Sequence, residues 1–418
     1  MEEKKKIDTE LERNSMISFS LIMVSNLLSA VFQIISGKCL NDVELYGELN
    51  AIFSLYNILV IPNAIFAFIV SKYMAEIWHG DLNKRGETKG FLKLMGKILL
   101  GLACVMSIGE LLFADQICVY LNIDNQGYTY LLILLVAVAI VTPLATGSLQ
   151  GMKAFVAYGV IGMIGPLFKV LGVLMSILTQ RKIECILLVM LVGSIIAVAI
   201  GIYLVIKRVG KYEKQASQIT VKAIFCFGVM TCIVNVGLTL LSNIDMLLIK
   251  HYFNDVAGLY SVALVLGKLT QYIASAIVVV LFPMTVVAKS EDASRNMLKK
   301  SLLYTGILSA AALLVLYFMG SFIISLLYGS DFMGAVNYIV PVAVMIFPIN
   351  FITILVNYAL GTGRYKVTAA TLILEVLIDV GLIVLWHESI IQVIAILTVM
   401  NIIVAMINMV YFLRRKKG

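Results

Sequence analysis

The chain has 418 residues, of which 61% are hydrophobic and 13% charged, and its formal net charge is +8. Soluble domains carry roughly 25% charged residues, so this composition excludes an ordinary soluble protein and indicates repeated membrane crossing. The six cysteines form no CxxC pair and the three histidines lie in separate segments, so we expect no disulfide framework and no metal site.

Long apolar runs follow one another along the whole chain. Each is long enough to cross a hydrocarbon core of ~30 Å as a helix, the form in which a chain satisfies its own backbone in lipid. The expected spans are residues 15–36, 47–71, 92–114, 128–150, 155–178, 184–206, 223–249, 257–288, 301–327, 335–360, 367–386 and 389–412. We therefore predict an all-α integral membrane protein with about 12 transmembrane helices.

The connections between these runs are short. The longest polar stretches, residues 72–91 and 207–222, leave no room for a soluble catalytic domain, and no GxxxxGK[ST] phosphate loop is present. We expect a protein that is not an enzyme and has no cofactor.

Lysine and arginine are distributed unevenly over the connections. With the N-terminus inside, 26 of the 32 basic residues fall on the inner side and four, Lys38, Arg181, Lys182 and Lys250, on the outer side. This bias follows the positive-inside rule and predicts that both termini are cytoplasmic. The basic loops then contact anionic membrane lipids, and the net charge needs no nucleic-acid partner.

One segment occurs twice, half a chain apart. Residues 41–47 read NDVELYG and residues 254–261 read NDVAGLYS, each in a polar break between apolar runs. A weaker echo joins the glycine-containing loops 149–155 and 359–365. Six spans separate equivalent positions, which predicts two parallel six-helix lobes. We place the first lobe at 1–206, a linker at 207–222 and the second lobe at 223–418.

Among the charged residues inside the predicted spans we single out Glu110, Lys169, Asp245, Lys268, Glu375 and Asp379. A charge at the bilayer centre costs roughly 2.5–3.5 kcal/mol on insertion scales, so such residues normally face a cavity or a partner. We assign Lys169 and Lys268 to binding of an anionic substrate and the four acids to ion coupling or to the cavity. The structural alternatives are a salt bridge inside the bundle, an interfacial Glu110, and pairing of Asp245 with Lys250.

Several motifs resemble those of bacterial polysaccharide flippases of the multidrug/oligosaccharidyl-lipid/polysaccharide superfamily. They are SNID at 242–245, GLYSVA at 258–263, LFP at 281–283, LYGSDF at 327–332 and LQG at 149–151. The resemblance covers essentially the whole chain.

The resemblance implies an O-antigen or capsular repeat-unit flippase of the Wzx type in the bacterial cytoplasmic membrane. Its substrate would be an undecaprenyl-pyrophosphate-linked oligosaccharide, moved from the inner to the outer leaflet by alternating access. H⁺ or Na⁺ would be the coupling ion, and a polysaccharide polymerase and glycosyltransferases would be partners. A multidrug exporter of the same superfamily stays open as an alternative, because the intramembrane acids outnumber the lysines. A lipid II flippase is a further alternative but a poorer match, because such flippases commonly carry two further spans and an arginine-rich cavity.

Overall fold

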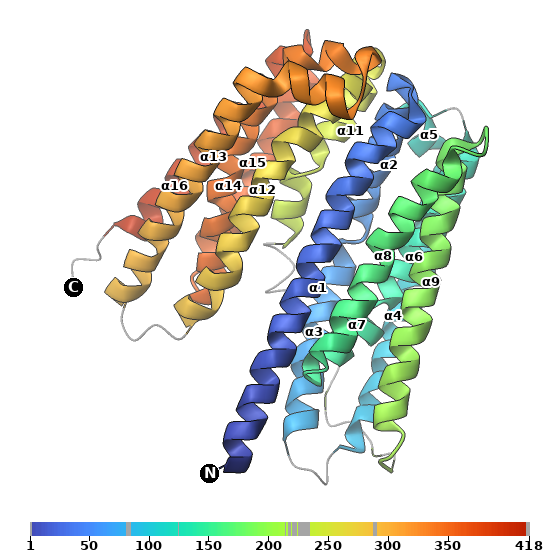
Figure 1. The fold of residues 1–418 in the computed structure, drawn as a ribbon, viewed down its shortest axis with the longest axis vertical. Helices are drawn as coiled ribbons and strands as arrows, with labels where there is room; N and C mark the ends of the chain where they lie inside the picture. Colours follow the sequence, from blue (N-terminus) through green and yellow to red (C-terminus); the bar gives the residue numbers. More distant parts are fainter. Residues whose placement is uncertain are drawn as a thin grey trace. The chain divides into compact units, whose positions relative to one another are not determined.

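The computed structural model describes residues 2–80, 85–123, 125–213, 215, 219, 224, 235–286 and 291–414. These ranges contain helices joined by short turns and no strand (Figure 1). They divide into two compact units, one formed by Met1–Leu40 and Tyr56–Cys232 and the other by Asn41–Leu55 and Ile233–Gly418. The division passes through α2 (Val43–Leu59).

In the described ranges, the N-terminal unit contains eight further helices. They are α1 (Glu2–Leu40), α3 (Ile61–His79), α4 (Glu87–Leu112), α5 (Ala114–Leu121), α6 (Gln126–Val141), α7 (Pro143–Gly151), α8 (Phe155–Ser176) and α9 (Lys182–Val209). The C-terminal unit contains α11 (Ile244–Tyr252), η2 (Asn254–Val256), α12 (Ala257–Val286), α13 (Glu291–Leu327), η3 (Ser330–Ala335), α14 (Val336–Gly361), α15 (Lys366–Leu385) and α16 (Ile390–Leu413).

Ten helical stretches in the described ranges are long and apolar enough to cross a membrane. They coincide with the first six and the last four spans expected from the sequence. The remaining two, 223–249 and 257–288, include residues outside the described ranges. The all-helical prediction is confirmed, whereas the lobe boundaries at 206 and 223 stay predictions.

Prolines divide two of the spans. Pro62 lies at the start of α3 and Pro143 at the start of α7, directly after α2 and α6. A proline in the first helical turn replaces an amide that has no helical partner, so it starts a new helix at little cost. Each of these spans is therefore two helices in sequence.

The small-residue stripe of α9 packs inside the N-terminal unit. Gly193 faces the side chain of Phe168 on α8, and Gly201 faces Ala145 on α7. Gly193, Ala197 and Gly201 are all buried. Small residues at this four-residue spacing let the helices of the N-terminal unit pack closely.

The two copies of the repeated segment lie together in the C-terminal unit. In the first copy, the Asp42 Oδ1 atom accepts bonds from the backbone amides of Glu44 (2.8 Å) and Leu45 (3.1 Å), which caps the start of α2. Gly47 approaches Gly258 so closely that a Cβ on Gly47 would lie 2.8 Å from the Gly258 nitrogen.

An aromatic cluster adjoins this contact. Tyr46 from the first copy packs edge-on against Tyr328 and Phe332, with ring centroids 5.8 and 5.7 Å away, and all three rings are buried. The beginning of α2 is therefore fixed to the C-terminal unit by packing, although the rest of the N-terminal half forms the other unit.

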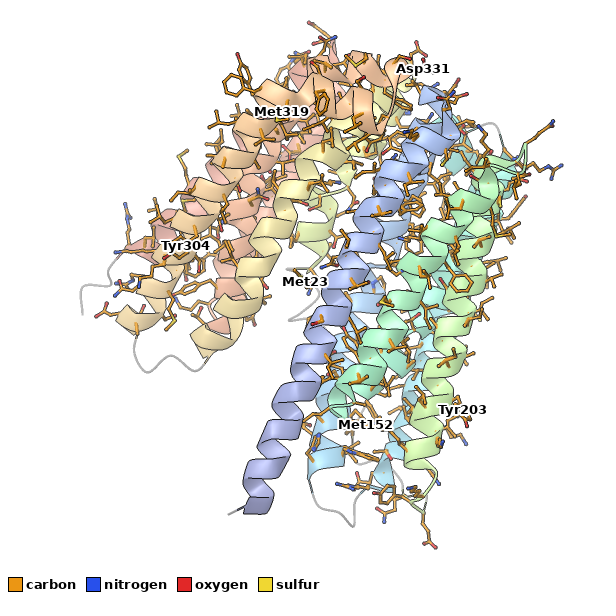
Figure 2. The ribbon with its side chains drawn as sticks, in the orientation of Figure 1. Met23, Met152, Tyr203, Tyr304, Met319 and Asp331 are labelled. Atoms are coloured by element: carbon orange, nitrogen blue, oxygen red, sulfur yellow. The ribbon has the colours of Figure 1, made fainter. Side chains whose placement is uncertain are left out.

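Large apolar side chains cover the outside of the helices. Tyr203, Tyr304 and Met319, for example, project outward and are 61%, 55% and 46% exposed (Figure 2). An apolar exterior of this extent is what a protein needs when lipid, rather than water, surrounds it.

Replacement of Gly258 by alanine tests the contact between the two repeats. The added Cβ would overlap the carbonyl of Val43, so we expect Gly258→Ala to lower the free energy of unfolding by roughly 1–3 kcal/mol. Thermal unfolding of the purified protein in detergent measures the effect. Gly381→Ala is the control, because a methyl group there meets nothing within 4 Å. Equal melting temperatures for the two variants would contradict this packing.

Candidate functional site

A break in a membrane helix creates the first polar cluster of the C-terminal unit. The helix at 235–241 ends at Ser242 and Asn243, and α11 begins at Ile244. The Lys268 Nζ atom on α12 donates a 2.6 Å hydrogen bond to the Ser242 carbonyl at this break. Carbonyls at a helix C-terminus lack helical partners and carry partial negative charge, so a lysine is a suitable partner there.

Asp245 belongs to the same cluster. Its Oδ2 atom accepts a 2.7 Å hydrogen bond from the Tyr260 hydroxyl, and the residue is 3% exposed. Asp245 also interacts electrostatically with Lys268. A carboxylate, an ammonium group and a phenol thus surround the start of α11, and the Asp245 Oδ1 atom has no hydrogen-bond partner in the described part of the chain.

The second cluster is a pair of carboxylates on α15. Glu375 and Asp379 are one helical turn apart, and both are fully buried. None of their four carboxylate oxygens has a hydrogen-bond partner among the described residues. Helix α15 packs against α16, where the buried Asn401 also has a side-chain oxygen without a partner in those ranges.

This pair has a definite chemical consequence. Two neighbouring carboxylates in an apolar interior cannot both be ionised unless a cation lies between or beside them. The pair therefore suits binding of a proton or a small cation with oxygen ligands. The described ranges contain no group of three or more His, Cys, Asp or Glu side chains that could hold a metal ion.

The remaining two sequence-predicted residues lie in the N-terminal unit. Lys169 is half-buried on α8, and its Nζ atom lies 5.8 Å from the centroid of the Phe32 ring on α1, a cation–π contact. Glu110 on α4 is 7% exposed, and neither carboxylate oxygen has a hydrogen-bond partner in the described ranges. Its burial differs from the exposed, interfacial position considered as the structural alternative.

The structure thus brings together Asp245 with Lys268 and Glu375 with Asp379. Sequence reasoning missed two contributors: Tyr260 and the Ser242 carbonyl. Tyr260 lies within the repeated segment, and that segment was a usable signal. A backbone carbonyl at a helix break gives no such signal.

Comparison with solved structures shows an all-helical transporter fold. The chain resembles an inward-facing multidrug resistance MATE family transporter of the MOP superfamily (13% identity, 95% of this chain and 97% of that one, TM-score 0.76). It also resembles the lipid II flippase MurJ in an inward closed conformation (15% identity, 95% and 87% coverage, TM-score 0.73). A MOP superfamily transporter from Pyrococcus furiosus, described with a binding pocket of reverse polarity, is similar as well (13%, 97% and 94%, TM-score 0.56).

These likenesses show the fold, and with the ten apolar helical stretches of the described ranges they define the class as an all-helical, multi-pass membrane protein. Residues 11–289, more than half of the chain, match the family model described as polysaccharide biosynthesis protein, and the chain belongs to this family. No curated protein sequence matches the chain.

Neutral substitutions test the electrostatic state of the α15 pair. An ionised carboxylate is costly in this apolar position. We therefore expect Asp379→Asn and Glu375→Gln to leave the free energy of unfolding unchanged or to raise it by roughly 1 kcal/mol. Thermal unfolding at neutral pH measures this, with the exposed Asp331→Asn as the control. A marked loss of stability in both α15 variants would show that the carboxylates are ionised with a fixed partner.

Proposed function

We propose that the protein is a flippase that moves an undecaprenyl-pyrophosphate-linked oligosaccharide repeat unit from the inner to the outer leaflet of the bacterial cytoplasmic membrane. Alternating access of two lobes is the mechanism, and an ion gradient or the membrane potential drives it. The observation that carries this proposal is the family match over residues 11–289, because a polysaccharide-biosynthesis membrane protein with a transporter fold needs a lipid-linked sugar as its cargo.

The buried cations support an anionic substrate. Lys169 holds a positive charge within the N-terminal unit, and Lys268 holds one within the C-terminal unit. A diphosphate head group is recognised by such groups through charge-assisted hydrogen bonds. Lys268 already donates one ammonium proton to the Ser242 carbonyl. A hydrogen bond from Lys268 to the substrate phosphate would use another of its three ammonium protons.

The acidic pair supports ion coupling. Glu375 and Asp379 are buried without hydrogen-bond partners in the described ranges, so their energy depends strongly on whether a proton or cation is bound. A group of this kind can couple ion binding to the balance between two conformations. A unit charge that crosses 100 mV gains about 2.3 kcal/mol, enough to shift such a balance more than tenfold.

A multidrug exporter is the second candidate. Among the six candidate residues, the acids Glu110, Asp245, Glu375 and Asp379 outnumber the two lysines. This excess favours the exporter, since organic cations prefer an acidic cavity. Deletion of the gene separates the two functions. Accumulation of lipid-linked sugar in the inner leaflet supports the flippase, and altered drug tolerance with normal surface glycan supports the exporter.

Replacement of Lys169 tests the substrate site. The loss of one charge-assisted bond to a phosphate corresponds to roughly a 10- to 100-fold effect, so we expect Lys169→Ala to reduce surface polymer at least tenfold. Lys169→Arg should retain part of the activity because it keeps the charge. Surface glycan is measured at matched protein levels, with the exposed Lys153→Gln as the control. Unchanged display in Lys169→Ala would remove this residue from the site.

Substitutions in the acidic pair test coupling. In vesicles that contain labelled lipid-linked oligosaccharide, flipping by the wild-type protein should respond to an imposed H⁺ or Na⁺ gradient. Glu375→Gln and Asp379→Asn should abolish that response, because a neutral amide cannot exchange a proton and binds cations weakly. Asp331→Asn should behave as the wild type. A gradient response that persists in both α15 variants would exclude the pair as the coupling site.

A further inference from the structure

The C-terminal unit has an apolar groove on three helices. Its volume is about 440 Å³, and its walls come from α13, α14 and α16, including Ala310, Phe347, Pro348 and Met406. Phe347 and Phe351 pack edge-on in it, with ring centroids 5.2 Å apart. The groove is open to the outside of the bundle, because Met406 is 53% exposed. A space of this shape and polarity fits a hydrocarbon chain.

The groove leads toward positive charge. Met409 lines both this groove and an adjoining smaller one that reaches Arg414, the residue that follows α16. On α13, Lys299 and Ala310 are about three turns apart and so share one helix face. An exposed lysine and an exposed arginine therefore lie beyond the same end of the groove, on the side that the positive-inside count predicts to be cytoplasmic.

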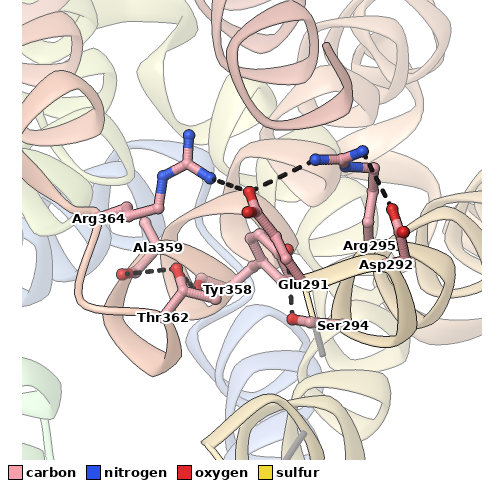
Figure 3. A network of polar contacts seen from close by, with 8 residues as sticks. All are labelled: Glu291, Asp292, Ser294, Arg295, Tyr358, Ala359, Thr362 and Arg364. Carbon is pink, nitrogen blue, oxygen red and sulfur yellow. Dashed lines mark hydrogen bonds and ion pairs between the residues drawn. The ribbon is translucent and has the colours of Figure 1, made fainter. Parts of the chain in front are cut away.

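Two arginines at this end already have acidic partners. Glu291 accepts from Arg364 (2.8 Å) and pairs with Arg295 (3.4 Å), and Asp292 pairs with Arg295 (3.5 Å), as Figure 3 shows. No such ion pair within the described ranges involves Lys299 or Arg414. Lys299 and Arg414 are therefore available to an external anion, and they lie in line with the groove.

The arrangement recurs in the N-terminal unit. There an apolar groove of about 630 Å³ is lined by α4, α6 and α9, which include Cys104, Val138 and Ile195. In the order of spans these three helices correspond to α13, α14 and α16 of the other unit. Lys97 on α4 is exposed and lies two turns from Cys104 on the same face. The combination of an apolar groove with a cation at one end is thus present in both halves.

We propose that the α13–α14–α16 groove is a binding site for an anionic phospholipid of the surrounding membrane. One acyl chain fills the groove, and the phosphate contacts Lys299 and Arg414. The groove is apolar along the helices and cationic at one end. An anionic phospholipid matches both parts, because its acyl chain is apolar and its phosphate is negatively charged. This site is separate from the proposed substrate residues and does not depend on which cargo is transported.

Native mass spectrometry of the purified full-length protein tests the site. Protein is exchanged between micelles with phosphatidylglycerol or phosphatidylcholine, and a phosphatidylglycerol with a photoreactive acyl chain locates the bound lipid. We expect preferential retention of phosphatidylglycerol and crosslinks to α13, α14 or α16. Lys299→Gln/Arg414→Gln should weaken this binding roughly fivefold for each cation removed. Lys300→Gln/Lys366→Gln, which removes the same charge from exposed neighbours, should have little effect.

The groove itself is tested separately. Ala310→Trp fills it from the lipid side and should reduce crosslinking to these helices, whereas Ala311→Trp, at an exposed position on another face of α13, should not. Equal retention of the two lipids would mean adventitious membrane lipid only and would overturn the proposal. The proposal would also be overturned if Lys299→Gln/Arg414→Gln and Lys300→Gln/Lys366→Gln weakened phosphatidylglycerol binding equally. Crosslinking to these helices by an isoprenoid phosphate probe alone would overturn it too.

Discussion

The structure depends on one constraint, the cost of a polar group without a partner where water is absent. In the hydrocarbon core, every backbone amide and carbonyl must find its partner within the protein. The helical form of the long apolar runs follows directly. The constraint also decides where a helix can be interrupted, because an interruption exposes carbonyls that need another donor. At Ser242 that donor is the Lys268 ammonium group, 2.6 Å from the carbonyl oxygen.

The same constraint explains how much of the fold the sequence could predict. Apolar length alone located the ten spans found in the described ranges, since a helix must bridge a fixed thickness. Hydropathy averaged over a span conceals its interruptions, however. The turn at Ser242 and Asn243 lies inside what was expected as one run, 223–249. The extension of α13 back to Glu291, ahead of the expected start at 301, is too polar to register as part of a span.

The candidate site was predictable only in part, for a related reason. A charge inside an apolar run is visible in the sequence, and the four-residue spacing of Glu375 and Asp379 places both on one helix face. Whether such a charge has a partner depends on other helices, and the partner can be a backbone atom or a single phenol, as with Lys268 and Asp245.

The buried charges of the C-terminal unit therefore fall into two kinds with different consequences. Asp245 and Lys268 are held by hydrogen bonds of 2.7 and 2.6 Å, so a change in either would disturb the helix break that they stabilise. Glu375 and Asp379 have no such bonds in the described ranges, so what binds to them changes their energy without breaking an existing contact. The first kind keeps an interrupted helix in place. In the proposed function, the second kind would supply the difference in ion affinity that favours one conformation over another. When Glu375 and Asp379 are ionised and hold no cation, their burial raises the free energy of the protein. A bound proton or cation removes this cost, and the pair therefore responds to ion binding.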